Sequence, residues 1–296
     1  MTAAPEFSFI TPTYQGAAFL PRCHWSLTRQ TLTDWEWVVI DDGSTDGTAD
    51  VIAALGDARI RYHRLPQNLG RGRAREVALR QARGRWAVIM DVDDLSLPDR
   101  LARASAARAE GFSFFCSAMV LIDAAYGIGP VRGCVDSGEP RMFPHATLCG
   151  DLELLRRIGY PPLRRAEDQT MVLTLANTAR GVFCKEPLYA YHEAASITPG
   201  AAWRSNWSAL GQIRALARAG VLTRSAGLRR LKRERVARLI GLLPFLIWPR
   251  AYEKTLRRRE NFAAGAQPLE AAGRAFIAEC ARRFPLKPIA PFVHAA

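Results

Sequence analysis

The chain has 296 residues, of which 49% are hydrophobic and 23% charged, and this composition excludes a disordered protein. Its six cysteines include no CxxC pair, so we expect free thiols in a reducing compartment and neither a disulfide framework nor a zinc site. The formal net charge is +13, but residues 200–260 alone hold 15 lysines and arginines against 3 acidic residues, so the positive excess is local.

Strand and helix patterns alternate through residues 1–90. Short apolar runs predict strands at 7–10, 35–40, 59–65 and 86–90, and helical spacing predicts helices near 20–31, 48–55 and 72–83. We expect a proline-restricted turn at Thr11–Tyr14, a cap from Asp46 on the second helix, and an end at Gly84 for the third. The alternation predicts an α/β fold in which helices cover a mostly parallel sheet.

Three polar segments stand directly after predicted strands. They are Tyr14, Asp41–Asp46 and Asp91–Asp94. Open sheets of this class bind ligands beyond the carboxyl ends of their strands, so we expect these segments to share one edge of the sheet.

The last of these segments carries three carboxylates, Asp91, Asp93 and Asp94. Carboxylates this close raise each other's pKa unless a cation or hydrogen bonds compensate. One interpretation is a site for Mg²⁺ or Mn²⁺, because these ions prefer oxygen ligands and often share them with the phosphates of a substrate. The other is a polar turn after a buried strand, and the segment by itself leaves both open.

The second half of the chain is less regular. We expect helices from Pro98 to about residue 109, at 151–159 with Asp151 as cap, and at 166–178; strands at 112–122, 182–184 and 188–192; and loops over 123–150. From Trp203 onward, apolar residues alternate with arginines. This change in sequence pattern predicts a first domain at 1–200 and a basic, mostly helical region at 201–296.

Five short motifs follow one another in the first domain. They are TPTYQ, VVIDDGSTDGT, NLGRGRARE, MDVDD with LPDRL after it, and a late EDQ. Each is weak alone, but together, in this order, the sequence resembles the family 2 glycosyltransferases over roughly residues 5–195. The resemblance implies a GT-A catalytic domain with a C-terminal helical extension, and an enzyme that transfers sugar from a nucleotide-sugar donor.

The resemblance also assigns the donor-binding residues. Those implied to surround the nucleoside are Pro12, Tyr14, Asp42 and Asp46. Arg75 is the best match for the arginine that faces the diphosphate, with Arg71 and Arg73 as alternatives, because a guanidinium can bind phosphate oxygens in pairs.

A divalent cation, Mn²⁺ or Mg²⁺, is implied at the acidic motif. Asp93 would hold the ion, while Asp91 and Asp94 would bind or orient nearby, with Asp91 also counted among the donor-binding residues. The ion would neutralise charge on the departing nucleoside diphosphate. His192 stands where the family often has a histidine before a Ser/Thr loop, and it is either a third metal or donor-loop residue or a structural histidine.

Asp168 matches the general base of the family. It would take the proton from an acceptor hydroxyl as that oxygen attacks the anomeric carbon from the opposite face, which inverts the stereochemistry. The alternative is an acidic residue that only suits the start of a helix, and this is the interpretation given to Glu167.

The sequence departs from the family at several points. Glu76 stands where an asparagine is usual, and the QxxRW motif of processive synthases is absent, so we expect one sugar transferred per encounter. UDP is the expected nucleotide by family habit, and the acceptor is expected to be a saccharide or a lipid-linked molecule of a surface glycan. GRGRARE does not complete a GxGxxG motif, which argues against a dinucleotide site.

The basic region has three interpretations: a solvated helical face, a membrane-surface anchor, or a nucleic-acid surface. Tryptophans beside arginines in residues 203–259 favour an anionic membrane surface, and no nucleic-acid module is recognisable, so nucleic acid is not expected as a partner. A non-catalytic nucleotide-sugar-binding or docking protein of the same fold remains the alternative function.

The expected location is the cytoplasm. The sequence shows no signal-peptide pattern and no run of the roughly 18 to 20 apolar residues that a membrane span requires. Peripheral association with the inner face of the plasma membrane is the open alternative.

Overall fold

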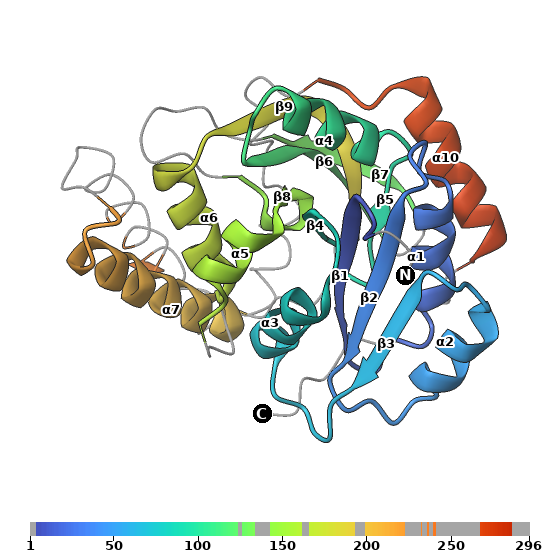
Figure 1. Ribbon diagram of the computed structural model, residues 1–296, viewed down its shortest axis with the longest axis horizontal. Coiled ribbons are helices and arrows are strands. Elements are labelled where there is room, and N and C mark those ends of the chain that lie inside the picture. The colour runs from blue at the N-terminus through green and yellow to red at the C-terminus, as the bar shows by residue number, and fades with distance from the viewer. Residues whose placement is uncertain are drawn as a thin grey trace.

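Figure 1 shows a computed structural model of the chain. It describes residues 4–123, 126–133, 143–161, 166–192, 199–222 and 267–285, together with residues 232, 236, 239 and 240. Within this part of the chain, nine strands form one sheet, with the order β3-β2-β1-β4-β8-β6-β9-β5 and with β7 paired to β6.

The first four strands form the parallel half of the sheet that the sequence predicts. They are β1 (Phe7–Thr13), β2 (Trp35–Asp41), β3 (Ile60–Arg64) and β4 (Trp86–Ile89). Almost every residue of β1, β2 and β4 is buried, because both faces of this half carry helices.

The other half of the sheet is mixed. Its strands are β5 (Leu95–Ser96), β6 (Phe114–Ile122), β7 (Ile128–Arg132), β8 (Cys149–Asp151) and β9 (Gly181–His192). β8 joins the halves because it pairs antiparallel with both β4 and β6, whereas β9 runs parallel to β6. The predicted α/β fold class, a central sheet covered by helices, is confirmed.

Two layers of helices cover the sheet. One core cluster joins the sheet to α1 (Leu20–Thr28), α2 (Thr48–Leu55) and α4 (Arg100–Ala109). The second joins it to α3 (Arg71–Gln81), α5 (Leu152–Ile158) and α6 (Asp168–Thr178). The predicted cap of the 151–159 helix is present, since the Asp151 carboxylate accepts a hydrogen bond from the Leu154 N–H at 2.8 Å.

Beyond residue 198, the described ranges contain two longer helices. α7 (Pro199–Arg218) packs on α6 through Ile213 and Leu173, and α10 (Ala271–Arg283) returns to cover β5, β6 and β9. Phe276 of α10 stacks on Trp25 of α1 with ring centroids 4.7 Å apart. No described helix is both long and apolar enough to cross a membrane. The domain boundary at residue 200 stays a prediction.

The predicted turn at Thr11–Tyr14 is wrong, because β1 continues to Thr13. β1 pairs with β4 only as far as Ile10, but with β2 as far as Thr13. Alternate residues of a strand direct their backbone groups to the same side, so Pro12, like Ile10, faces β4. Because β4 no longer pairs with β1 at Pro12, the N–H that proline lacks would have had no hydrogen-bond partner there.

Gly84 does not end α3, which stops at Gln81 with Ala82 already extended. Its role is close approach: a Cβ at position 84 would lie 2.6 Å from the Ser8 hydroxyl oxygen. Glycine therefore stands here because β1 passes directly beside it.

Two expectations for the second half are also wrong. Residues 123–150 are not all loop, since they contain β7, a 3-10 turn at His145–Thr147 and the start of β8. The two strands at 182–184 and 188–192 are one strand, β9, whose register against β6 shifts between Ser117 and Met119. Pro187 pairs at that irregularity, which is where a strand interior tolerates proline. Residues 134–142 lie outside the described part of the chain.

Candidate functional site

The loops that follow β1 and β2 are joined at one edge of the sheet, as the sequence predicts. The Gln15 N–H donates to the Ser44 hydroxyl at 2.9 Å, and the Gln15 side-chain oxygen accepts from the Thr45 N–H at 2.8 Å. The Asp46 carboxylate accepts from the Ala17 N–H at 3.0 Å. Gln15 has a φ of +54°, so this turn is held in a conformation that L-residues rarely adopt.

Asp42 fixes the next loop along the edge. Its two carboxylate oxygens accept hydrogen bonds from the Leu69 and Gly70 N–H groups, both at 2.8 Å, and its side chain is buried. This holds the turn that leads into α3. Pro12 is buried in β1, whereas the Tyr14 side chain is 48% exposed and accessible to a ligand. The nucleoside contacts implied for these residues stay predictions.

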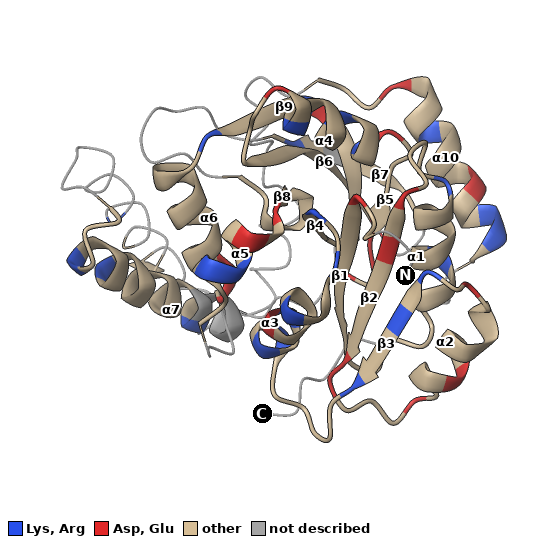
Figure 2. Cartoon of the chain, viewed as in Figure 1, with Lys and Arg blue, Asp and Glu red and all other residues tan. Residues whose placement is uncertain are grey.

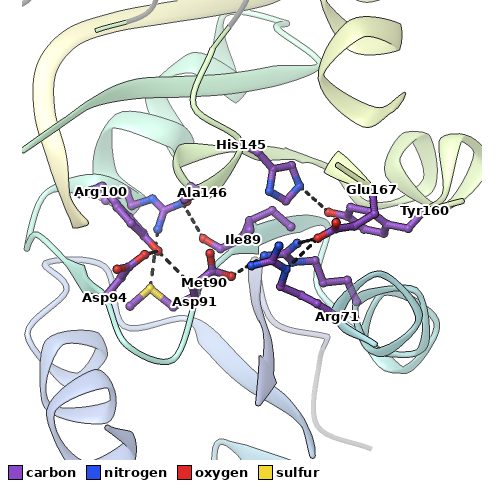
Figure 3. Close-up of polar contacts among 12 residues, drawn as sticks. Arg71, Ile89, Met90, Asp91, Asp94, Arg100, His145, Ala146, Tyr160 and Glu167 are labelled. Carbon is purple, nitrogen blue, oxygen red and sulfur yellow. Dashed lines mark hydrogen bonds and ion pairs between the residues drawn. The ribbon is translucent and has the colours of Figure 1, made fainter. Parts of the chain in front are cut away.

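A buried guanidinium stands at the centre of the edge. Arg75 of α3 donates to the Asp91 carboxylate at 2.5 Å and to the Glu167 carboxylate at 2.9 Å, and only 2% of its surface is exposed. Arg71, one turn earlier, donates to the same Glu167 oxygen at 2.8 Å (Figure 3). α3, the end of β4 and the start of α6 are thereby tied together.

Charge in this cluster is balanced by the pairing. Burial would raise the pKa of Asp91, but Arg75 and Arg71 outweigh it, and the pKa is lowered. Burial likewise disfavours the charged Arg75, but Asp91 outweighs it, so the pKa of the guanidinium is raised. Both partners therefore remain ionised.

Glu167 is a site residue that the sequence reading assigned only to the start of a helix. It is 1% exposed and accepts from two arginines, so it belongs to the charge network. Arg71 and Arg75 lie four residues apart and therefore share one face of α3. These two arginines, together with the acidic pair Glu167–Asp168 much later in the sequence, were the signal that could have predicted the network. Behind them the Tyr160 hydroxyl and the His145 ring share a 2.8 Å hydrogen bond.

The three carboxylates of the acidic motif have different surroundings. Asp94 is completely buried and accepts from the Tyr189 hydroxyl at 2.6 Å and from the His192 N–H at 2.7 Å. Burial, then Asp93 and Asp91, raise its pKa well above the ordinary value. Burial and then Asp91 raise the pKa of Asp93 to about 6.

Two of these three carboxylates could serve as oxygen ligands to a hard divalent cation. Across the described ranges, no group of three or more His, Cys, Asp or Glu side chains is placed to hold a metal by itself. Mg²⁺ commonly takes one or two carboxylates and completes its shell with water and substrate phosphates. The repulsion from Asp91 that raises the pKa of Asp93 is the kind that a bound cation relieves.

His192 ends β9 beside this motif. Its ring is 6% exposed, and neither ring nitrogen has a hydrogen-bond partner among the described residues. Burial and then Arg22 lower the pKa of His192 to about 4, so the ring is neutral at pH 7. The metal-ligand roles of Asp93, Asp94 and His192 stay predictions.

Two further buried arginines flank the acidic motif, and sequence analysis did not single them out. Arg22 of α1 donates to the Asp93 carbonyl oxygen and, at 3.2 Å, to the Tyr126 hydroxyl. Arg100 of α4 donates to the Ile89 carbonyl at 2.8 Å and lies 4.8 Å above the Tyr189 ring. Arg100 belongs to the LPDRL motif, which was read only as part of a pattern.

Asp168 is the first residue of α6, directly after the anchored Glu167. Burial and then Glu167 raise its pKa, while Arg75 and Arg71 act in the opposite sense. The Asp168 carboxylate accepts a hydrogen bond from its own backbone N–H, and no side chain in the described part of the chain donates to it. Its oxygens are therefore available to a ligand, and its raised pKa makes it a stronger base than an ordinary aspartate.

Comparison with known proteins finds similarity in both sequence and fold. Residues 8–131 match the model of Glycosyl transferase family 2. The succinoglycan biosynthesis protein ExoO of Rhizobium meliloti is 39% identical over 99 residues, which is 33% of this chain. The match covers only 28% of ExoO.

Two solved structures share the fold at low identity. The S. aureus protein TarS (residues 1–349), in complex with UDP-GlcNAc, has a TM-score of 0.58 and 21% identity over 94% of this chain and 80% of that one. The mannosyltransferase PcManGT of Pyrobaculum calidifontis, in complex with GDP-Man and Mn²⁺, has a TM-score of 0.58 and 20% identity over 97% and 82%. Both similarities extend beyond the family match, since they cover 94% and 97% of this chain.

Replacing Arg75 with methionine leaves the partly buried Asp91 without its partner and the buried Glu167 with Arg71 alone. We expect the free energy of unfolding at pH 7 to fall by about 3–5 kcal/mol, as for other broken buried ion pairs. Arg80→Met is the control on the same helix, because Arg80 pairs with Glu76 at the surface and should cost less than about 1 kcal/mol. Urea denaturation measures both.

The pH dependence of this effect has a definite sign. Because Arg75 lowers the pKa of Asp91, the stabilisation is present above the ordinary aspartate pKa, about 3.9, and is lost as pH falls through the lower folded value. The gap between wild type and Arg75→Met should therefore shrink below about pH 4. Equal stability of the two proteins at pH 7 would contradict the network.

Proposed function

Since residues 8–131 carry a family 2 glycosyltransferase domain, we propose that the protein transfers a sugar from a nucleoside-diphosphate sugar to a saccharide or lipid-linked acceptor in the biosynthesis of a surface glycan. The observation that carries the proposal is the arrangement at the sheet edge, where an unengaged carboxylate with a raised pKa, Asp168, adjoins the Arg71 and Arg75 cluster. Cations and a base are what this transfer requires.

The donor would lie along the carboxyl ends of β1, β2 and β4. Pro12, Tyr14, Asp42 and Asp46 would border the nucleoside. The diphosphate is proposed to bind Arg71 in preference to Arg75. Both terminal nitrogens of Arg75 already bind carboxylates. The Arg71 side chain, in contrast, is 60% exposed and engages Glu167 through its Nε. UDP is the proposed nucleotide. The TarS structure is a complex with UDP-GlcNAc, and the PcManGT structure is a complex with GDP-Man.

A divalent cation, Mn²⁺ or Mg²⁺, would be held by Asp93 with Asp91 nearby. When bound, it would neutralise charge on the departing diphosphate. Asp94 is proposed to orient the motif, because its oxygens already accept from Tyr189 and the His192 backbone. PcManGT, whose structure contains Mn²⁺ and GDP-Man, supports a metal-dependent donor site.

Asp168 would act as general base. As the acceptor hydroxyl oxygen attacks the anomeric carbon, its proton passes to an Asp168 carboxylate oxygen and the nucleoside diphosphate leaves from the opposite face. This single displacement inverts the configuration of the transferred sugar. We propose one transfer per encounter, because the QxxRW motif of processive synthases is absent from the sequence.

A membrane surface is proposed as a partner of the C-terminal region. The side of α7 away from α6 carries Arg204, Trp207, Arg214 and Arg218, all exposed and spaced along one helical face. Figure 2 shows the blue of Lys and Arg recurring along α7. Cations and an exposed tryptophan suit an anionic lipid surface, and we place the protein at the inner face of the plasma membrane. Three more aromatic residues of the basic region, Phe245, Trp248 and Tyr252, lie outside the described residues.

Asp168→Asn should keep donor affinity and lose transfer. A general base contributes about 10²- to 10⁴-fold, so kcat/KM should fall by that factor, while calorimetric binding of the nucleoside diphosphate is unchanged. Because Asp168 must be ionised and its pKa is raised, wild-type kcat/KM should decline as pH falls through that raised value. Glu153→Gln, at the surface of α5, is the control, and wild-type transfer by Asp168→Asn would refute the assignment.

Asp93→Ala should weaken metal-supported donor binding. Removing the hydrogen-bond partner of a metal ligand typically lowers metal affinity at least about tenfold. Removing the ligand itself should lower metal-supported nucleotide affinity by at least as much. The measurement is nucleotide affinity with Mn²⁺ and with EDTA, against Asp50→Ala on exposed α2 as control. Equal affinity of Asp93→Ala and wild type under both conditions would exclude the metal assignment.

The membrane proposal is tested by vesicle flotation. Wild type should float with phosphatidylglycerol vesicles at low salt and be released as salt rises. Arg214→Gln with Arg218→Gln should weaken partitioning by about tenfold or more, at roughly 1 kcal/mol per charge. Arg274→Gln with Arg282→Gln on α10 is the charge-matched control. Failure of wild type to float at low salt would exclude the anchor.

A further inference from the structure

A buried amide on α7 reaches the start of α6. Gln212 is 6% exposed, and its side-chain oxygen accepts from the Thr170 N–H at 3.1 Å and from the Thr170 hydroxyl at 2.6 Å. Its side-chain nitrogen donates to the Ala166 carbonyl. These three hydrogen bonds hold Ala166, directly before the Glu167–Asp168 pair in the chain, and Thr170, two residues after it.

The first turn of α6 needs this help. The N–H groups of a first helical turn lack partners within the helix, and a side chain at the N-cap usually accepts from one of them. Here the N-cap residue is Glu167, and its side chain makes no such bond. Its Oε1 accepts from Arg71 and Arg75 instead, and its Oε2 has no hydrogen-bond partner among the described residues. Gln212 supplies the missing acceptor from a neighbouring helix.

The backbone before the base is strained. Ala166 has a φ of +53°, a left-handed conformation that a residue with a Cβ rarely adopts. Such a conformation persists only where its surroundings impose it, and it costs of order 1–3 kcal/mol. The bond from Gln212 to the Ala166 carbonyl is a restraint of that kind.

The surroundings of Gln212 show that packing alone does not explain a glutamine here. Beside it, α6 and α7 meet through apolar side chains, with Leu173, Ile213 and Leu222 forming one buried cluster. An amide buried next to such a cluster is unfavourable unless its polar atoms are bonded. Both Gln212 polar atoms are bonded, and their partners lie on either side of Asp168 in the chain.

We propose that Gln212 is a positioning residue for the general base, holding the first turn of α6 so that the Asp168 carboxylate meets the acceptor hydroxyl. This inference rests on the proposed role of Asp168. It makes α7, which lies beyond the matched family segment, part of the catalytic unit. One face of α7 then positions the base, while the opposite face is the proposed membrane surface.

Gln212→Met tests the inference, because methionine is similar in size and removes all three hydrogen bonds. We expect kcat to fall roughly tenfold to a hundredfold, as for other small misplacements of a reacting group, while the affinity for UDP with Mn²⁺ is unchanged. Thr170→Val removes only the hydroxyl bond and should show a smaller loss in kcat of the same kind. It keeps the test decisive if Gln212→Met does not fold.

The matched control is Ile213→Val, which removes one methyl group from the same interface. A purely structural role for this contact predicts that Gln212→Met resembles Ile213→Val, with a lower melting temperature and normal kcat. That result, or a kcat loss matched by an equal loss in UDP affinity, would overturn the proposal. If Asp168→Asn transfers sugar normally, the base assignment itself fails, whereas an inactive Asp168→Asn with a fully active Gln212→Met refutes the role of Gln212 alone.

Discussion

The buried guanidinium of Arg75 is the constraint on which the rest of the site depends. A charge that is 2% exposed is tolerated only with partners, and its partners come from the end of β4 and the start of α6. Because Arg75 binds Asp91 and Glu167 together, the acidic motif and the proposed base are held at one edge of the sheet, although they lie far apart in the sequence.

Four aspartates at this edge of the sheet acquire different properties from their surroundings. Asp91 is paired and its pKa is lowered, while the pKa of Asp93 is raised to about 6 by burial and by Asp91. Asp94 is enclosed by Tyr189 and β9, and Asp168 is unengaged with a raised pKa. Environments that separate the pKa values of neighbouring acids allow one residue type to serve as ligand, orienting group and base.

The sequence predicted the parts of the fold that local patterns determine. Apolar runs located β2 and α2 closely, the Asp151 cap located α5, and strand ends identified the edge where the candidate residues gather. The predicted Asp46 cap of α2 is wrong, because the N-cap residue of that helix is Gly47. β7 and β8 were missed because such short strands form through partners distant in the chain. Glu167, Arg100 and Gln212 were missed for the same reason, since a side chain's role in a buried network depends on which elements pack against it.

The central claim is that this edge binds a nucleoside diphosphate through a metal ion. Calorimetric titration of the wild-type chain with UDP, GDP and dTDP, each with Mn²⁺ and with EDTA, tests it most directly. The account predicts that one nucleotide, expected to be UDP, binds with Mn²⁺ and binds much more weakly with EDTA. Absence of binding by all three nucleotides under both conditions would contradict it and would favour a non-catalytic protein of the same fold.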